Sequence, residues 1–409
     1  MLSAARIATW FCIWLAFYLL AVVSPQLRVL KGNSDFLAQY TAGQLLLQGQ
    51  GEHLYDVEAQ KQVQAKVLAS LNSDVQFAEG LLLFTHPPFV ALSYVPVARL
   101  PFVTGFLVWN GISFICFVTG VAQMVRYYRL HEQPDFEVLT FLCLFYLPLS
   151  ATLLQGQNTA VGFLFLVLSF LSFKRGSELK AGIWLSLVLV KFQLLPVMLL
   201  VLLFKRRWQA LLGFCVGGFV LTLISLGVVG WEGLWRYLKL LSEMPQWVNR
   251  FGLNPLGADC IRGQMFLLFH NTLPGVIPGM TILLDVMLVI VLFKCWKGQW
   301  NAQSEFFDLK FALLIIVGLL VAPHVNFHDQ AFLLLPGLVV FHHTAKEGVL
   351  KDSRLRSTLF VVGFPLQVLS FIALPIVPIQ FNVIGLIALT AVLFHTIRSR
   401  GPGRFVKLH

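Results

Sequence analysis

Long apolar stretches recur along almost the whole chain, separated by shorter polar segments. A helix needs about 20 largely apolar residues to cross the hydrocarbon core of a bilayer. The pattern therefore predicts an all-α polytopic membrane protein with about twelve transmembrane helices. The predicted spans are 7–24, 82–99, 103–124, 138–154, 158–173, 181–203, 209–230, 275–293, 308–322, 329–343, 357–373 and 380–396. No small-residue cleavage site follows the first span, so we interpret it as a retained helix.

Basic residues gather in particular connections between the spans, and this predicts the orientation of the chain. A cytoplasmic N-terminus and an even number of spans return the basic C-terminal tail to the cytoplasm. The basic connections that fall on the same side are 205–208, 294–305 and 344–356. Two others, 126–129 and 174–180, come out on the opposite face and disagree with the count.

Three segments on the outer side are long or chemically rich: 25–81, 231–274 and 323–329. The first contains amphipathic patterns that predict helices at 36–48 and 57–71. The second opens with aromatic and basic residues, which are typical of a helix lying in the membrane interface. Because all three lie on one side, we expect them to form a shared site.

Composition limits the function classes. The chain is 57% hydrophobic and only 12% charged, which excludes a soluble core. The net charge of +11 follows from the basic connections, so we interpret it as a topology signal and expect no nucleic-acid partner. The six cysteines show no Cys-x-x-Cys spacing, and we predict neither a disulfide framework nor a zinc site.

Asp35 lies just beyond the first span and precedes an apolar-periodic run. One interpretation is a general base that takes a proton from an acceptor hydroxyl at the dry membrane edge. The other is a helix N-cap, because aspartate before such a run is a common start signal.

His324 and His328 are four residues apart, with Asp329 following. A metal site is one interpretation, although the glutamate of the metalloprotease motif is missing. A helix start capped by Asp329 is a second. The third is anion recognition, in which histidine or loop amides hold a phosphate near the membrane surface.

Several other polar residues interrupt apolar surroundings. Lys191 and Asp285 fall inside spans, where a charge is costly and is a functional candidate by default. The two could also pair with each other, or Lys191 could extend toward an interface, since Pro196 is expected to break that helix. His86 precedes two prolines that set the entry angle of the second span. Gln157 and Asn158 belong to a polar break that is richer in amides than a mere turn requires.

Short motifs in a fixed order resemble one known family. They are Ser34-Asp35-Phe36 with Tyr40 and Ala42, Gly51-Glu52-His53-Leu54-Tyr55-Asp56, His86-Pro87-Pro88, Pro96-Val97-Ala98-Arg99-Leu100-Pro101, Gly156-Gln157-Asn158, Ala181-Gly182 followed by Lys191, Asn254-Pro255-Leu256, and Pro323-His324 with His328-Asp329 and Pro336. The ordered set over residues 30–340 resembles glycosyltransferase family 87, the polyprenol-phosphate-mannose-dependent mannosyltransferase-like proteins of the GT-C superfamily. Thr85-His86 and Asn254-Pro255 depart from the usual family pattern.

The resemblance implies a GT-C-like fold, with 1–409 as a single integral membrane domain. Residues 1–274 would form the catalytic module and 275–409 the C-terminal helices. It also implies a sugar donor carried on polyprenyl phosphate and Asp35 as the base. The residues expected to bind substrate or phosphate are His324, His328, Tyr40, Tyr55, His86, Gln157, Asn158, Lys191 and Arg262, with Arg250 as an alternative to Arg262.

We therefore expect an inverting hexosyltransferase that moves a sugar, mannose by resemblance, to a lipid or glycan acceptor. The site would face the periplasm or exterior of a bacterial inner membrane. No glycine-rich phosphate loop or paired-aspartate metal motif occurs in the sequence, so we expect no cofactor and no metal. The alternatives are a lipid or glycolipid transporter or flippase, which charges inside spans would suit, and a non-catalytic subunit of an envelope-assembly complex.

Overall fold

The computed structural model describes residues 2–133, 135–244, 247, 250–251, 254–345, 353–373 and 376–400, and their secondary-structure elements are helices, as predicted. The α-helices are α1 (Leu2–Val22), α2 (Phe36–Leu47), α3 (Val57–Ser70), α4 (Pro88–Ala98), α5 (Phe102–Tyr128), α6 (Phe136–Leu144), α7 (Leu147–Leu154), α8 (Thr159–Lys174), α9 (Glu178–Leu187), α10 (Leu195–Phe204), α11 (Trp208–Glu243), α12 (Ile261–Phe269), α13 (Ile277–Cys295), α14 (Glu305–Val321), α15 (Leu334–Ala345), α16 (Ser353–Gly363), α17 (Pro365–Ala373) and α18 (Phe381–Arg400). Two 3₁₀ segments matter below: η5 (Val188–Leu194) and η9 (Phe327–Leu333).

Seven segments of the described chain are long and apolar enough to cross a membrane. They are Ala4–Val22, Phe102–Tyr128, Phe136–Leu154, Glu178–Phe204, Trp208–Glu243, Pro274–Cys295 and Phe381–Ser399. The chain is therefore an integral membrane protein, while the predicted number of twelve spans stays a prediction.

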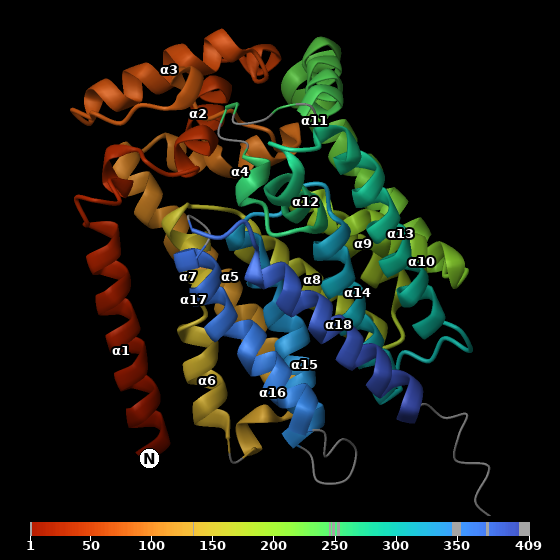
Figure 1. Cartoon of the computed structure of the whole chain (residues 1–409). Helices are drawn as coiled ribbons and strands as arrows, with labels where there is room; N and C mark the ends of the chain where they lie inside the picture. The colour runs from red at the N-terminus through yellow and green to blue at the C-terminus, as the bar shows by residue number, and fades with distance from the viewer. Residues whose placement is uncertain are drawn as a thin grey trace, which may run out of the picture.

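The predicted outer segments meet at one end of the molecule, which we call the site end. Figure 1 shows α2, α3, α4, α12 and the last part of α11 gathered there, beyond the long helices. The predicted helices 36–48 and 57–71 are α2 and α3, each within one residue. In α11 the backbone breaks at Gly230 (φ 67°, ψ −177°), where the sequence predicts a span to end.

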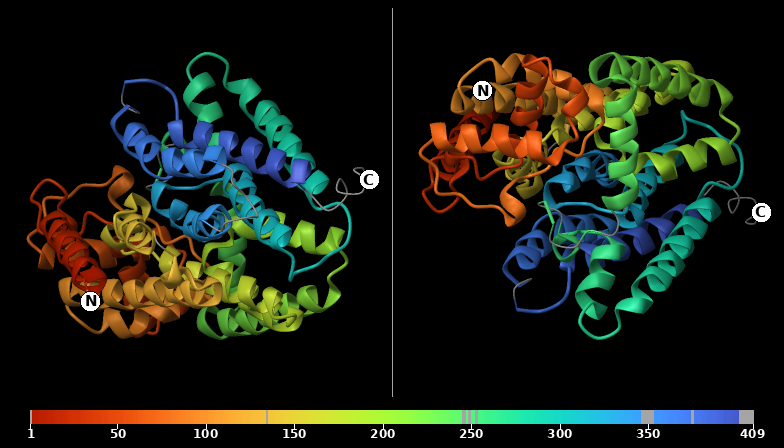
Figure 2. Two further views of the ribbon diagram at one scale, coloured as in Figure 1. Left: turned by 90° about the horizontal axis from the view of Figure 1, so that it is seen from below. Right: turned by 90° about the horizontal axis from the view of Figure 1, so that it is seen from above.

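Viewed along the long helices, the elements up to α11 occupy one side and those from α12 to α18 the other (Figure 2). Helix α14, on the second side, also packs against α10 and η5 of the first, and most of its side chains are buried. Its two ends lie at the two ends of the molecule, and a buried cluster of charged side chains lies at each of them.

The predicted span 82–99 differs from the structure, because the helix within it does not run from one end of the molecule to the other. Both ends of α4 lie against the first outer segment. The Tyr55 hydroxyl donates to the carbonyl of His86, just before α4. The Tyr40 hydroxyl donates to the carbonyl of Leu100, just after it. With only 11 residues, α4 is also shorter than a span requires.

The predicted span 181–203 is a helical hairpin rather than one helix. Lys191, in η5 between α9 and α10, has non-helical dihedral angles (φ −141°, ψ 68°). Arg207, just after α10, forms an ion pair with Glu178 at the start of α9. A straight helix of this length would hold those residues about 40 Å apart at 1.5 Å per residue. The two ends of the hairpin therefore lie beside each other, and Lys191 lies near its apex.

These two differences explain the basic connections that disagreed with the sequence count. Lys174 Nζ lies 3.3 Å from the carbonyl oxygen of Ser304, and Lys205 donates to the carbonyl of Gly298. Arg356 pairs with Asp135 at 2.5 Å. The connections near 129–135 and 174–178 thus lie with those near 205–207 and 296–304, at what we call the basic end. The predicted outer placement of 126–129 and 174–180 is wrong, because α4 was counted as a span and the hairpin as one.

Candidate functional site

The turn between α7 and α8 is fixed onto the start of α2. The backbone N–H of Phe36 donates to the carbonyl of Gln155 at 2.8 Å. The backbone N–H of Asp35 donates to Gln155 Oε1 at 3.0 Å. Gly156 has a φ of 61°, and a Cβ there would lie 2.6 Å from Phe36 Cβ. Only glycine combines this backbone conformation with such a close approach.

Asp35 is held by an amide rather than by its own helix. Gln157 Nε2 donates to Asp35 Oδ2 at 2.7 Å. Among the described residues, the Asp35 side chain makes no capping hydrogen bond to α2, although Asp35 occupies the N-cap position. The helix-cap interpretation therefore lacks its hydrogen bond. The carboxylate is partly exposed, and it faces a cavity.

Lys191 is paired within the same region. Its Nζ lies 2.8 Å from Asp329 Oδ1, and both side chains are almost completely buried. The alternative in which Lys191 pairs with Asp285 is wrong, because Lys191 pairs with Asp329 and Asp285 lies on α13. His328 Nε2 lies 3.4 Å from both Lys191 Nζ and Asp329 Oδ1. We call Lys191, His328 and Asp329 the outer cluster.

Asp329 also has the capping role that the sequence predicted, as the third residue of a capping box. The backbone N–H of Asn326 donates to Asp329 Oδ2 at 3.0 Å, and Asn326 is the N-cap of η9. Thr159, the first residue of α8, lies with its Oγ1 3.2 Å from Asp329 Oδ1. Asp329 therefore joins the start of η9, the start of α8 and the apex of the hairpin.

A cavity of about 190 Å³ opens among these segments. Six of the ten predicted site residues line it: Asp35, His86, Gln157, Lys191, Arg262 and His324. The other lining residues include Gln39, Phe84, Phe192, Trp247, Asn326 and Asp329. The structure thus brings together, from five regions of the chain, two cations, two histidines and the Asp35 carboxylate, which is not part of the Lys191–Asp329 pair.

The remaining four predicted residues lie behind the cavity wall. Tyr40 and Tyr55 donate to backbone carbonyls on either side of α4. Asn158 Nδ2 donates to the carbonyl of Val190 at 3.2 Å and so holds the hairpin apex. His328 belongs to the outer cluster. Their predicted binding roles stay predictions, and their contacts are those of residues that position the site.

The sequence interpretation missed Gln39 as a lining residue. Gln39 Nε2 lies 3.4 Å from His86 Nε2, on the first turn of α2 after Asp35. Its position one helical turn from Asp35 was the available signal, since residues four apart share a helix face. The described residues contain no group of three or more histidine, cysteine, aspartate or glutamate side chains suited to a metal.

Burial makes the histidines of the site poor bases. Burial, together with the Lys191 ammonium, lowers the pKa of His86 to about 3. Burial likewise holds the pKa values of His324 and His328 below their usual range. Near neutral pH these imidazoles are uncharged, so a histidine here acts as a hydrogen-bonding group. Within the described residues, His324 Nε2 has no hydrogen-bond partner.

The fold and this cavity define an integral membrane protein with a polar site enclosed by helices and outer segments. The sequence model of glycosyltransferase family 87 matches residues 84–323, which is more than half of the chain. The chain therefore belongs to glycosyltransferase family 87, and its membership indicates a glycosyltransferase. No curated protein and no solved structure matches it. Asp35 and the outer segment from His324 onward lie outside the matched residues.

Proposed function

We propose that this chain transfers a sugar, mannose as the expected one, from a polyprenyl-phosphate donor to a lipid or glycan acceptor. The proposal rests on one observation: the Asp35 carboxylate shares a single cavity with Lys191, Arg262 and His324. A base and a phosphate-binding group are what such a displacement requires. The proposed site faces the extracytoplasmic side of a bacterial inner membrane, since the basic connections lie at the opposite end.

The chemistry is a single displacement. An acceptor hydroxyl oxygen attacks the anomeric carbon of the donor while its proton passes to the Asp35 carboxylate. The bond from the anomeric carbon to the phosphate oxygen breaks, and polyprenyl phosphate leaves with the electron pair. One displacement inverts the anomeric configuration. Gln157 acts as a positioning residue, because its hydrogen bond to Oδ2 fixes the orientation of the carboxylate.

The leaving group needs charge stabilisation rather than a proton. A phosphate monoester has a second pKa of about 6, so it departs as an anion near neutral pH. Lys191 and Arg262 supply positive charge at the cavity, and His324 supplies a hydrogen-bonding nitrogen. A second catalytic acid is therefore unnecessary, in contrast to most glycosidases.

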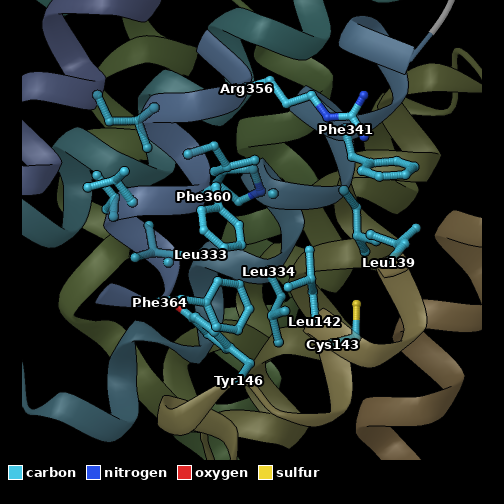
Figure 3. A pocket seen from close by; sticks show the side chains of 18 of the residues that line it. Leu139, Leu142, Cys143, Tyr146, Leu333, Leu334, Phe341, Arg356, Phe360 and Phe364 are labelled. Carbon is cyan, nitrogen blue, oxygen red and sulfur yellow. The ribbon is translucent and has the colours of Figure 1, made fainter. Parts of the chain in front are cut away.

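A second cavity provides room for the isoprenoid tail of the donor. It has a volume of about 580 Å³ and lies between α6, α15 and α16, with apolar side chains around most of it (Figure 3). Tyr146, at its edge, donates to the carbonyl of Gln330, the residue after Asp329. Gly337 also lines this cavity, and a Cβ there would meet no atom within 4 Å. Gly337→Leu should therefore raise KM for a long-chain donor more than for a truncated one.

Transfer of labelled sugar from polyprenyl phosphate to a crude lipid acceptor pool tests the proposal. Asp35→Asn should lower the rate by more than about 10²-fold, as expected for a missing general base. The matched control is Asp56→Asn. Asp56 lies in the same outer segment, but its side chain caps α3 by accepting from Glu58 N and Ala59 N. Asparagine also caps helices.

The control variant should keep wild-type activity. Equal activity of Asp35→Asn and the wild type would remove Asp35 from the mechanism. The proposed donor class would be wrong if the wild type transferred sugar from a nucleotide-linked donor and did not transfer it from polyprenyl phosphate.

A further inference from the structure

A third cavity lies at the basic end, remote from the proposed active site. Its volume is about 520 Å³, and it is enclosed by the end of α13, the connection 296–304, the start of α14 and the end of α18. Figure 1 shows the ends of α13 and α18 beside each other there. Among the described residues, no aspartate or glutamate lines it, and the cations that do are Lys294, Lys297, Lys310 and Arg398.

Among the described residues, several other cations at this end pair with carboxylates of the protein. Lys174 pairs with Asp308, Arg207 with Glu178, and Arg356 with Asp135. In the part of the chain that the structure describes, the four cations of the third cavity have no such carboxylate. Four like charges around one hollow repel each other, and an anion inside it would relieve that repulsion.

Helix ends explain only part of this arrangement. Lys294 lies in the last turn of α13 and Arg398 in the last turn of α18, where a cation is favourable beside the free carbonyl groups. Lys297 lies beyond the helix. Lys310 is one turn and a half inside α14, half-buried, with its Nζ 6.0 Å from the ring centroid of Trp296. The positions of Lys297 and Lys310 are therefore not explained by the attraction of a cation to a helix C-terminus.

Two tryptophans form an aromatic wall of the cavity, and they suit a position near the membrane interface. Trp296 and Trp300 stack, with ring centroids 5.2 Å apart. Tryptophan is enriched at the level of the lipid headgroups, where its ring has an apolar and a polar neighbour. The start of α14 adds no anion site of its own, because Ser304 caps it and Glu305 and Asp308 lie in its first turn.

We propose that this cavity binds the phosphate headgroup of an anionic phospholipid from the leaflet at the basic end. The lysine and arginine side chains make charge-assisted hydrogen bonds to the phosphate. Basic hollows between transmembrane helices on the cytoplasmic side are a recurrent form of such sites. The acyl chains lie along the exposed apolar faces of α13 and α18, which flank the cavity. This site is independent of the sugar-transfer proposal.

Lipid retention measured by native mass spectrometry tests the inference. The purified protein is equilibrated with mixed phosphatidylglycerol and phosphatidylcholine, and the bound lipids are counted. The test variant is K294Q/K297Q/R398Q, which changes only the exposed cations of the cavity. The control variant is R126Q/R175Q/K180Q, which removes the same charge from exposed positions at the same end.

Wild type and control should retain phosphatidylglycerol in preference to phosphatidylcholine. The test variant should bind it about 100-fold more weakly, at about 5-fold per cation. Equal retention by the test variant and the control would overturn the site. Thermal unfolding with inorganic phosphate separates the two sources of the anion. If millimolar phosphate alone stabilised the wild type as much as phosphatidylglycerol did, the ligand would be a soluble anion and the lipid proposal would fail.

Discussion

Two buried clusters of the same composition lie at opposite ends of the molecule. The outer cluster is Lys191, His328 and Asp329, and the inner cluster is Lys174, His343 and Asp308. Their lysine–aspartate distances are 2.8 and 2.6 Å. Helix α8 runs from one cluster to the other, since Thr159 at its start contacts the outer cluster and Lys174 at its end belongs to the inner one.

The clusters differ in how the backbone presents the lysine. Lys174 ends a regular helix, and its Nζ is held by Asp308 and the Ser304 carbonyl. Lys191 interrupts a hairpin with non-helical dihedral angles and lines the cavity that contains Asp35. A buried ion pair by itself therefore does not mark a functional site. What distinguishes the outer cluster is the break in the helix at Lys191 and the cavity that it shares with the Asp35 carboxylate.

The largest expected effect is one that the two clusters share. Removing one partner of a buried ion pair leaves an uncompensated charge and costs about 3–5 kcal/mol of stability. Lys174→Met and Lys191→Met should both lower the free energy of unfolding by that order, as measured by titration with a denaturing detergent. Removing both partners, as in K174M/D308L, should recover most of the loss. A Lys191→Met protein as stable as the wild type would show that the outer pair is not intact in the membrane.

Sugar transfer should separate the clusters. A charged hydrogen bond to the leaving phosphate contributes about 1.5–3 kcal/mol, so Lys191→Met should lower kcat/KM by about 10- to 100-fold per folded molecule. Lys174→Met should leave kcat/KM per folded molecule unchanged, because the inner cluster is remote from Asp35. Equal losses in the two variants would mean that both act through the fold alone.

At each end of the molecule a neutral side chain donates a hydrogen bond to a carboxylate, and replacing these two donors tests the comparison further. Gln157 donates to Asp35 at 2.7 Å, and the Tyr128 hydroxyl donates to Asp308 at 2.7 Å. Gln157→Leu should lower kcat about 10-fold with little change in KM, since it disorients the base without removing a substrate contact. Tyr128→Phe should lower stability and leave kcat unchanged. Steady-state kinetics at several acceptor concentrations give both constants, and a change in KM alone for Gln157→Leu would make it a substrate-binding residue instead.

Much of this organisation could be predicted from the sequence. Apolar length and amphipathic period located the outer segments, α2 and α3, because those signals are local. Asp35 and five other predicted residues do line one cavity. Pro196 indicated a break in this stretch, but the hairpin itself was not predicted, since a single helix of 27 residues and two short helices have the same composition.

The partner of Lys191 also lay beyond the sequence. Asp285 and Asp329 are both acids at the edge of or within apolar stretches, and pairing depends on which helices pack together. The roles of Gln155 and Gln157 were hidden for a similar reason. An amide in a turn can point to solvent or into the site, and here both side chains point to Asp35, Gln155 accepting from its backbone N–H and Gln157 donating to its carboxylate.

The last expected effect is the acid sensitivity of the site end. Burial lowers the pKa of His86 to about 3, well below the value of about 6.5 of an unfolded chain. As the pH falls below about 6.5, the unfolded chain takes up a proton that the folded site excludes, so stability is lost with falling pH by at most about 1.4 kcal/mol per pH unit. His86→Gln should flatten the dependence of the unfolding free energy on pH between 6.5 and 4.5. Thr85→Val, a change in the same cavity wall that does not titrate, should keep the wild-type slope. An unchanged slope in His86→Gln would mean that the imidazole is hydrated enough to accept a proton in the folded protein.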